Sequence, residues 1–269
     1  MRKNGGRTTK DGIRIYQQAD FAGMHVAGEL AARILDDIAE HVFVGQTTGA
    51  IDGMITKMVE DAGATSATIG YKGYQHASCI SVNHVVCHGI PGNKKLKDGD
   101  ILNIDVTVIV DGWFGDTSRM YVAGKLSRKA ERLIQVTHDS LMKGIEAVKP
   151  GNTFGDIGHA IQVYAESQRM SVVRDFCGHG LGEVFHAPPN VLHYGRPGTG
   201  ATLEEGMFFT IEPMINLGRP ETKILADDWT AVTRDKSLSA QFEHSIGVTA
   251  DGFEIFTLSP GGKYHPTYG

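Results

Sequence analysis

Hydrophobic and polar residues alternate with a period of two along residues 101–110, the pattern of a β-strand with one buried face. The apolar side of this alternation consists of Leu102, Ile104, Val106, Val108 and Val110. The dipeptide Asp111-Gly112 follows, and it favours the two-residue turn of a β-hairpin. We therefore predict a hairpin that begins near Ile101 and runs on to about Ala123.

The turn determines which residues of the two strands lie opposite each other. It pairs Thr107 with Asp116 and Asp105 with Ser118. Asp105 and Asp116 are then diagonal neighbours on one face, with backbones about 7–8 Å apart. Their side chains can reach metal ions about 3.5–4 Å apart. Acids on the polar face of a hairpin are more often solvated than metal-bound, so a metal site requires further ligands from the rest of the chain.

Apolar residues at three- and four-residue spacing predict two helices before the hairpin. The first extends from Asp20 to about Val42, with Asp20 as its N-terminal cap and Gly45 just past its end. The second begins at Thr47 or Thr48. Strands and loops are expected over residues 63–100.

A similar helix pair is predicted after the hairpin. Ser127 caps its first helix, Pro150-Gly151 ends that helix, and Thr153 caps the next. Residues 45–51 and 151–157 both read Gly-x-Thr-x-Gly-x-Ile, and each lies between two helices. We interpret this as an internal duplication. The predicted fold is α+β, with two pseudo-symmetric helix–helix–strand halves around a central antiparallel sheet and a ligand cleft between them.

Composition narrows the class of protein. The 269 residues are 41% hydrophobic, enough for a large core, and the net charge of −5 does not favour binding to DNA. Cys79, Cys87 and Cys177 form no C-x-x-C pair, so neither a disulfide framework nor a thiolate zinc site is indicated. The N-terminus has no secretory signal pattern, and no run of 18 apolar residues predicts a membrane span. A cytoplasmic protein fits best.

The two ends of the chain are polar. We expect residues 1–12 to be a flexible tail, or alternatively a basic arm that touches RNA, and residues 261–269 to be a mobile tail. Residues 13–260 are then a single catalytic domain.

The second half contributes further polar residues in strand or tight-loop settings. We expect His179 to lie in a glycine-rich loop; His186 precedes a proline pair, and Glu212 ends a strongly apolar strand. Glu243 lies in another alternating segment, which turns at residues 251–252 into a last strand. Each glutamate taken singly could be exposed or paired with a basic residue. Together with the hairpin acids they form a set of four carboxylates and one imidazole, which suits two divalent ions such as Mn²⁺, Fe²⁺, Co²⁺ or Zn²⁺.

Five motifs around these residues resemble the metal-ligand motifs of the methionine aminopeptidases, in that family's order. They are Asn103-Ile-Asp-Val-Thr, Gly115-Asp-Thr-Ser, Cys177-Gly-His-Gly-Leu-Gly, Thr210-Ile-Glu-Pro-Met and Ser239-Ala-Gln-Phe-Glu-His. The resemblance covers about residues 15 to 258 and implies the "pita-bread" fold. The short stretch from His179 to Glu212 is similar to type I enzymes, and the lack of a preceding Cys/His zinc-finger region is similar to the short bacterial form.

The resemblance implies a role for each ligand. Asp105 binds one metal ion, Asp116 and Glu243 bridge both, and His179 and Glu212 complete the second site. A metal-bridging hydroxide then attacks the first peptide bond of the substrate, and Glu212 also accepts the proton of that water.

The resemblance also assigns residues that contact the substrate. His186 hydrogen-bonds the scissile carbonyl oxygen, and His88 contacts the scissile amide nitrogen and helps the amine leave. The side chains expected to line the methionine pocket are Tyr71, Tyr74, Cys79, Phe185 and Trp229. Without the resemblance, these histidines and aromatic residues would equally suit loop or core positions.

The implied activity is removal of the initiator methionine from nascent chains whose second residue is small. Contact with the ribosome and a monomeric state are further expectations. One departure is that Phe185-His-Ala-Pro-Pro189 stands where many bacterial relatives read Phe-His-Glu-Glu-Pro, so acids beside the cleft are missing.

Two other functions are compatible with parts of this sequence pattern. A proline-directed peptidase of the same fold usually carries an additional N-terminal domain, for which this chain leaves no room. A non-catalytic binding module would have lost metal ligands, whereas all five positions are filled here.

Overall fold

The computed structural model describes residues 7–263 and residue 266. The other residues of the two predicted tails, 1–6, 264–265 and 267–269, lie outside the described residues. Residues 7–12 are described and contact the body of the protein. The Ile15 backbone N–H donates to the Arg7 carbonyl, and the Arg7 side chain forms an ion pair with Glu204.

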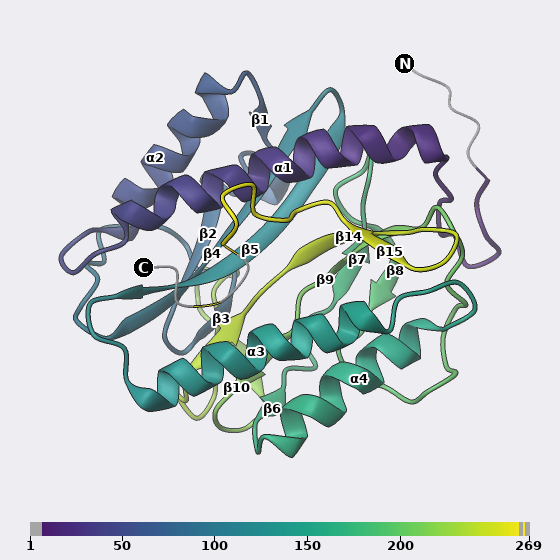
Figure 1. The fold of residues 1–269 in the computed structure, drawn as a ribbon. Helices are drawn as coiled ribbons and strands as arrows, with labels where there is room; N and C mark the ends of the chain where they lie inside the picture. Colours follow the sequence, from purple (N-terminus) through teal and green to yellow (C-terminus); the bar gives the residue numbers. More distant parts are fainter. Residues whose placement is uncertain (1–6, 264–265, 267–269) are drawn as a thin grey trace.

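The described helices and strands follow the predicted helix–helix–strand order (Figure 1). The helices are η1 Gln18–Asp20, α1 Phe21–Ile38, η2 Ala39–His41, α2 Thr48–Asp61, η3 Tyr71–Gly73, α3 Arg128–Glu146 and α4 Phe154–Ser167, where η marks a 3₁₀-helix. The strands before α3 are β1 Thr65–Ser66, β2 Ser78–Val82, β3 Val85–Cys87, β4 Asp100–Val110 and β5 Trp113–Ala123. Those after α4 are β6 Ser171–Val172, β7 Gly178–Gly180, β8 Ala187–Val191, β9 Phe208–Ile211, β10 Met214–Asn216, β11 Thr222–Ile224, β12 Ala231–Thr233, β13 Ser239–Gln241, β14 His244–Val248 and β15 Phe253–Ile255.

Three of the predicted helix starts are confirmed. The Thr47 hydroxyl accepts a hydrogen bond from the Ala50 backbone N–H at the start of α2, and Ser127 accepts one from Ala130 at the start of α3. Thr153 precedes α4, where both its backbone N–H and its hydroxyl donate to the Asp156 carboxylate. These contacts satisfy backbone or side-chain groups that a helix N-terminus leaves open.

The first helix begins directly after Asp20, as predicted, but its predicted side-chain cap and its predicted end are wrong. Asp20 does not cap α1, because its carboxylate instead accepts a hydrogen bond of 2.8 Å from the Gln17 N–H across the preceding turn η1. Helix α1 ends at Ile38, and the chain tightens into η2 before it reaches Gly45. Gly45 lies in the following loop at φ 94°, where its N–H donates to the Leu96 carbonyl.

The hairpin has the predicted register. Asp111 and Gly112 both have positive φ, 49° and 88°, as a type I′ turn requires. Thr107 lies opposite Asp116 and Asp105 opposite Ser118 in the β4–β5 pair.

The expectation of only one buried face on this hairpin is wrong. The apolar face packs under α1 and α2, but Asn103, Thr107 and Asp116 on the polar face are also buried. The second half covers them, since the Asn103 amide donates to the Gln241 carbonyl. The polar face is therefore an internal surface between the two halves.

The two junctions that share a motif are also alike in structure. The Gly49 N–H donates to the Gly92 carbonyl and the Gly155 N–H to the Thr199 carbonyl, each at 2.8 Å. A Cβ on either glycine would lie 3.0 Å or less from an oxygen of the facing loop. Each half also has its own hydrophobic core, one beneath α1 and α2 and one beneath α3 and α4.

All strand pairs in the described residues are antiparallel. The central sheet consists of two parts, one with β4 paired to β1, β2 and β5, and one in the order β15-β14-β9-β7-β8. Their edges meet where Ser118 of β5 bridges Glu243, which precedes β14. In Figure 1, α1 runs along the β4–β5 hairpin and α3 runs across β9 and β10.

Candidate active site

A cavity of about 900 Å³ lies where the two halves meet. Every residue that the sequence indicated as a site residue lines this cavity. These are Tyr71, Tyr74, Cys79, His88, Asp105, Asp116, His179, Phe185, His186, Glu212, Trp229 and Glu243. Their individual roles stay predictions.

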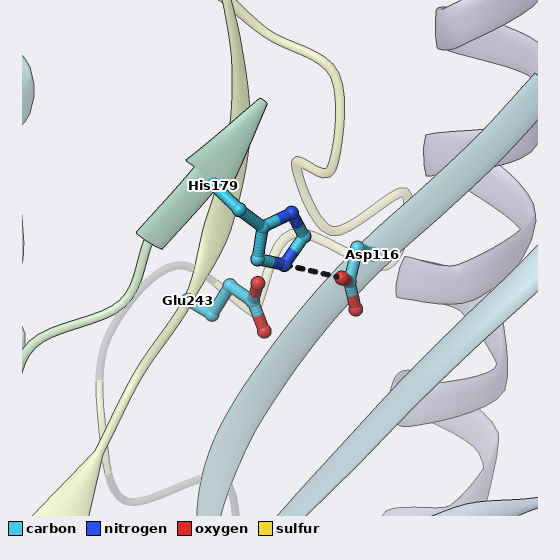
Figure 2. Close-up of side chains that lie close together, drawn as sticks. All are labelled: Asp116, His179 and Glu243. Carbon is cyan, nitrogen blue, oxygen red and sulfur yellow. Dashed lines mark ion pairs between the residues drawn. The ribbon is translucent and has the colours of Figure 1, made fainter. Parts of the chain in front are cut away.

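Three of the proposed ligands form a tight cluster. Asp116 comes from β5, His179 from β7 and Glu243 from the residue before β14, and one ligand atom of each lies within 4.8 Å of the others. Figure 2 shows the three side chains converging from these separate segments, with His179 Nε2 3.5 Å from Asp116 Oδ2. His179 thus lies in a short strand, not in the glycine-rich loop that its neighbours suggested.

Glu212 and Asp105 flank this cluster. Glu212 directly follows β9, and its Oε1 is 3.7 Å from His179 Nε2. Asp105 lies on β4, two residues before the Thr107 that pairs with Asp116.

Burial and neighbouring charges shift the pKa values of the proposed ligands. Burial raises the pKa of Asp105 and of Glu243 well above the usual range for an acid, and the neighbouring Asp116 and Glu212 carboxylates raise both further. Burial raises the pKa of Glu212 to about 7 against the opposing effect of His179. Burial lowers the pKa of His179, but Asp116 and Glu212 outweigh it and raise the net value.

This donor set fits divalent cations. Four carboxylates that repel one another need a positive charge among them to stay ionised in a buried site. The ion pairs that the described residues form with this set come from the His179 imidazole and not from a lysine or arginine. Oxygen donors with one imidazole suit Mn²⁺, Fe²⁺, Co²⁺ or Zn²⁺.

Hydrogen bonds orient the donor atoms toward the cavity. The His179 Nδ1 lies 3.2 Å from the Gly180 carbonyl, so a proton on Nδ1 leaves Nε2 free as a ligand. The Thr107 hydroxyl donates to Asp116 Oδ1 at 2.7 Å. The Glu243 backbone is fixed from both sides, by its own N–H donating to Ser118 and by the Thr117 hydroxyl donating to its carbonyl.

The two predicted catalytic histidines lie on the cavity wall. His88 has φ 56°, a strained conformation for a non-glycine residue of the kind often found at functional sites. Its ring contacts Trp229, with centroids 6.1 Å apart. The His186 ring lies 4.2 Å from that of His179. Burial lowers the pKa of both, that of His186 to about 4, so both imidazoles are neutral at pH 7.

The predicted pocket residues form aromatic walls beside the cluster. Tyr74 contacts Trp229 and Tyr71 contacts Phe185, each pair with ring centroids 5.0 Å apart. Cys79 is buried next to Asp105 in the register of β2 and β4, opposite it across the strand pair. The result is an apolar recess that adjoins the carboxylates.

Three residues that hold Glu212 were not identified from the sequence. The Thr210 hydroxyl donates to Glu212 Oε1, the Gln241 amide donates to Oε2, and His193 Nε2 accepts from the Glu212 N–H. The contact of Thr210 with Glu212 could have been predicted from the sequence, because residues two apart on a strand share a face. The contact of His193 could not have been predicted, since only the tertiary structure brings this residue beside Glu212.

Comparison with known proteins shows which family the chain resembles. The family model described as metallopeptidase family M24 matches residues 22–250. A methionine aminopeptidase of Rickettsia prowazekii (strain Madrid E) is 58% identical over 95% of this chain and 99% of its own length. One from Escherichia coli (strain K12) is 50% identical over 91% and 94% of the two chains.

A solved structure gives the same result. The crystal structure of methionine aminopeptidase from Rickettsia prowazekii matches with a TM-score of 0.91 at 59% identity, covering 91% of this chain and 100% of that one. The protein is therefore a metallopeptidase, a hydrolase with the two-halved α+β architecture called the pita-bread fold. Within that class, the chain belongs to the methionine aminopeptidase family. The resemblance read from the five sequence motifs is confirmed.

Proposed function

We propose that the protein removes the N-terminal methionine from nascent polypeptides whose second residue is small, using two divalent metal ions. The observation that carries this proposal is that the buried carboxylate–imidazole cluster and the apolar aromatic recess share one cavity. A thioether packs well against aromatic rings, so the recess suits a methionine side chain.

The five clustered residues would hold the ions. Asp105 would contribute to one ion, His179 and Glu212 to the second, and Asp116 and Glu243 to both. When bound, such ions lower the pKa of water from 15.7 to about 7 and polarise the substrate carbonyl.

Glu212 takes the proton of the attacking water. Its two carboxylate oxygens are held by Thr210 and Gln241, so its orientation is fixed before the substrate arrives. Proton transfer by a positioned side chain contributes about 10²–10⁴-fold to a rate.

The two neutral histidines contact opposite sides of the scissile bond. His186 donates a hydrogen bond to the carbonyl oxygen as negative charge develops there. His88 contacts the amide nitrogen and assists departure of the amine. Tyr71, Tyr74, Cys79, Phe185 and Trp229 enclose the methionine side chain.

The proposal includes where the enzyme meets its substrates. No described helix is long and apolar enough to cross a membrane. The substrates are the N-termini of nascent chains, which a monomeric, cytoplasmic enzyme would meet at the ribosome.

The test uses metal-free protein reconstituted with Mn²⁺ or Co²⁺ and the peptide Met-Ala-Ser. Release of free methionine is expected, with no release from Leu-Ala-Ser and a much slower reaction with Met-Trp-Ser. Glu212→Gln should lower kcat by about 10²–10⁴-fold. Absence of methionine release with Mn²⁺, Fe²⁺, Co²⁺ and Zn²⁺ alike would contradict the proposal.

A further inference from the structure

Lys72 occupies an unusual position on the wall of the active-site cavity. It lies within η3 with φ 47°, between Gly70 and Gly73, which also have positive φ. Its side chain is exposed and lines the cavity. Its Nζ lies 5.3 Å from the centroid of the Tyr71 ring, which holds the ammonium against that wall.

Lys72 lines the same cavity as the two histidines that are proposed to flank the scissile bond. The Tyr71 ring stacks on His186, with centroids 5.2 Å apart. Burial is the main cause of the lowered pKa of His88, and the positive charge of Lys72 lowers it further. The same charge also contributes to the lowered pKa of His186. Lys72 therefore lies on the same wall of the cavity as Tyr71 and His186.

The charges around Lys72 leave it available to a substrate. Among the described residues it forms no ion pair, and Ala187 and Pro188 beside His186 carry no charge. Two other acids line the cavity, Asp11 and Asp175. The Asp175 carboxylate accepts a 2.6 Å hydrogen bond from Thr222, and neither acid is among the charges that influence His88.

We propose that Lys72 is a specificity-determining residue that favours substrates with an acidic third residue. This inference rests on the proposed function, because it takes the scissile bond to lie between His88 and His186. The second residue follows that bond directly, and the third passes the Lys72 ammonium as the peptide leaves the cavity.

The expected preference is moderate because the ammonium is exposed to solvent. An exposed ammonium–carboxylate pair changes kcat/KM by about two- to fivefold, and salt screens it. Glutamine tolerates the positive φ of position 72 as well as lysine does. Lys72→Gln therefore removes the charge without adding backbone strain.

The experiment compares C-terminally amidated Met-Ala-Asp-Ser, Met-Ala-Asn-Ser and Met-Ala-Lys-Ser with the metal-loaded enzyme. For the wild type, kcat/KM should fall in that order, with about a two- to fivefold difference between adjacent peptides at low salt and a smaller one at 0.5 M NaCl. Lys72→Arg should keep the order, Lys72→Gln should remove it, and Lys72→Glu should reverse it. Lys129→Gln, which removes an exposed charge from α3, is the control and should keep the wild-type order.

The wild-type measurement alone can overturn the inference. Equal kcat/KM for the three peptides, or a preference for lysine, would contradict it even if a variant failed to fold. A preference that survives in folded Lys72→Gln would also contradict it. Failure to release methionine from any of the peptides would instead contradict the proposed function, so the two failures are distinguishable.

Discussion

The hydroxyl of Thr210 links two of the proposed metal ligands. It accepts a hydrogen bond from the His179 backbone N–H at 3.0 Å and donates its only proton to Glu212 Oε1 at 2.8 Å. Thr210 is fully buried, so no water can replace these contacts. One side chain thus fixes the distance between an imidazole on β7 and a carboxylate after β9.

Thr210→Val keeps the shape of this side chain but removes the hydroxyl. We expect metal affinity and kcat each to fall by about 10–100-fold, the usual effect of losing a group that orients a ligand. Calorimetric titration of Co²⁺ into the metal-free protein measures the affinity independently of activity. Thr65→Val, at an exposed position on β1, should leave both unchanged. Wild-type Co²⁺ affinity in Thr210→Val would show that the hydroxyl does not position the ligands.

At the scale of an element, the close contact of α1 with the hairpin depends on Gly115. A Cβ at this position of β5 would lie 2.2 Å from the Ala27 carbonyl oxygen of α1. That oxygen is backbone within a helix and cannot move aside. The glycine therefore lets the helix approach the strand that carries Asp116.

Gly115→Ala should lower the free energy of unfolding by about 1–3 kcal/mol, since the methyl group overpacks this interface. Gly53→Ala is the matched control, because nothing lies within 4 Å of a Cβ there and the position is exposed within α2. It should raise the stability by about 0.5–1 kcal/mol, as alanine favours helix over glycine. Urea unfolding measures both, and a neutral Gly115→Ala would mean that α1 can shift away from β5.

At the scale of the whole molecule, packing acts on two histidines, the fully buried His193 and the half-buried His244. Burial lowers the pKa of His193 and of His244 to about 3. An unfolded histidine has a pKa of about 6.5, so the unfolded state binds more protons between these values. Stability from these groups is present above about pH 6.5 and decreases as the pH falls toward 3.

Each of these histidines should therefore contribute up to about 1.4 kcal/mol less stability per pH unit below pH 6.5. In the metal-free protein the raised pKa values of Asp105, Glu212 and Glu243 act in the opposite direction, so the histidine contribution is measured as a difference between wild type and variant. Urea midpoints at pH 7.5, 6.5 and 5.5 should show that His244→Gln is more stable relative to wild type at pH 5.5 than at pH 7.5, whereas His41→Gln, at a partly exposed position, keeps a constant difference. A difference between His244→Gln and wild type that is the same at pH 7.5 and 5.5 would contradict this account.

The sequence by itself determined the local elements and the class of chemistry. The Asp111-Gly112 turn and the alternation of β4 are properties of neighbouring residues, so the register that makes Asp105 and Asp116 diagonal neighbours was predictable. The caps at Thr47 and Ser127 were predictable for the same reason. The five ligand motifs indicated the family, which the comparisons confirm.

Only the tertiary structure decided how the polar face of the hairpin is used. An isolated hairpin would leave Asp105 and Asp116 in water, but the second half covers this face and brings His179, Glu212 and Glu243 into the same cavity. The physical reason is that burial and distance between segments remote in sequence depend on how the two halves pack, which no local pattern encodes. That packing also placed His193 behind Glu212 and brought Lys72 and His88 to one cavity, and it turned the acids of a surface hairpin into a crowded, buried cluster that fits metal ions.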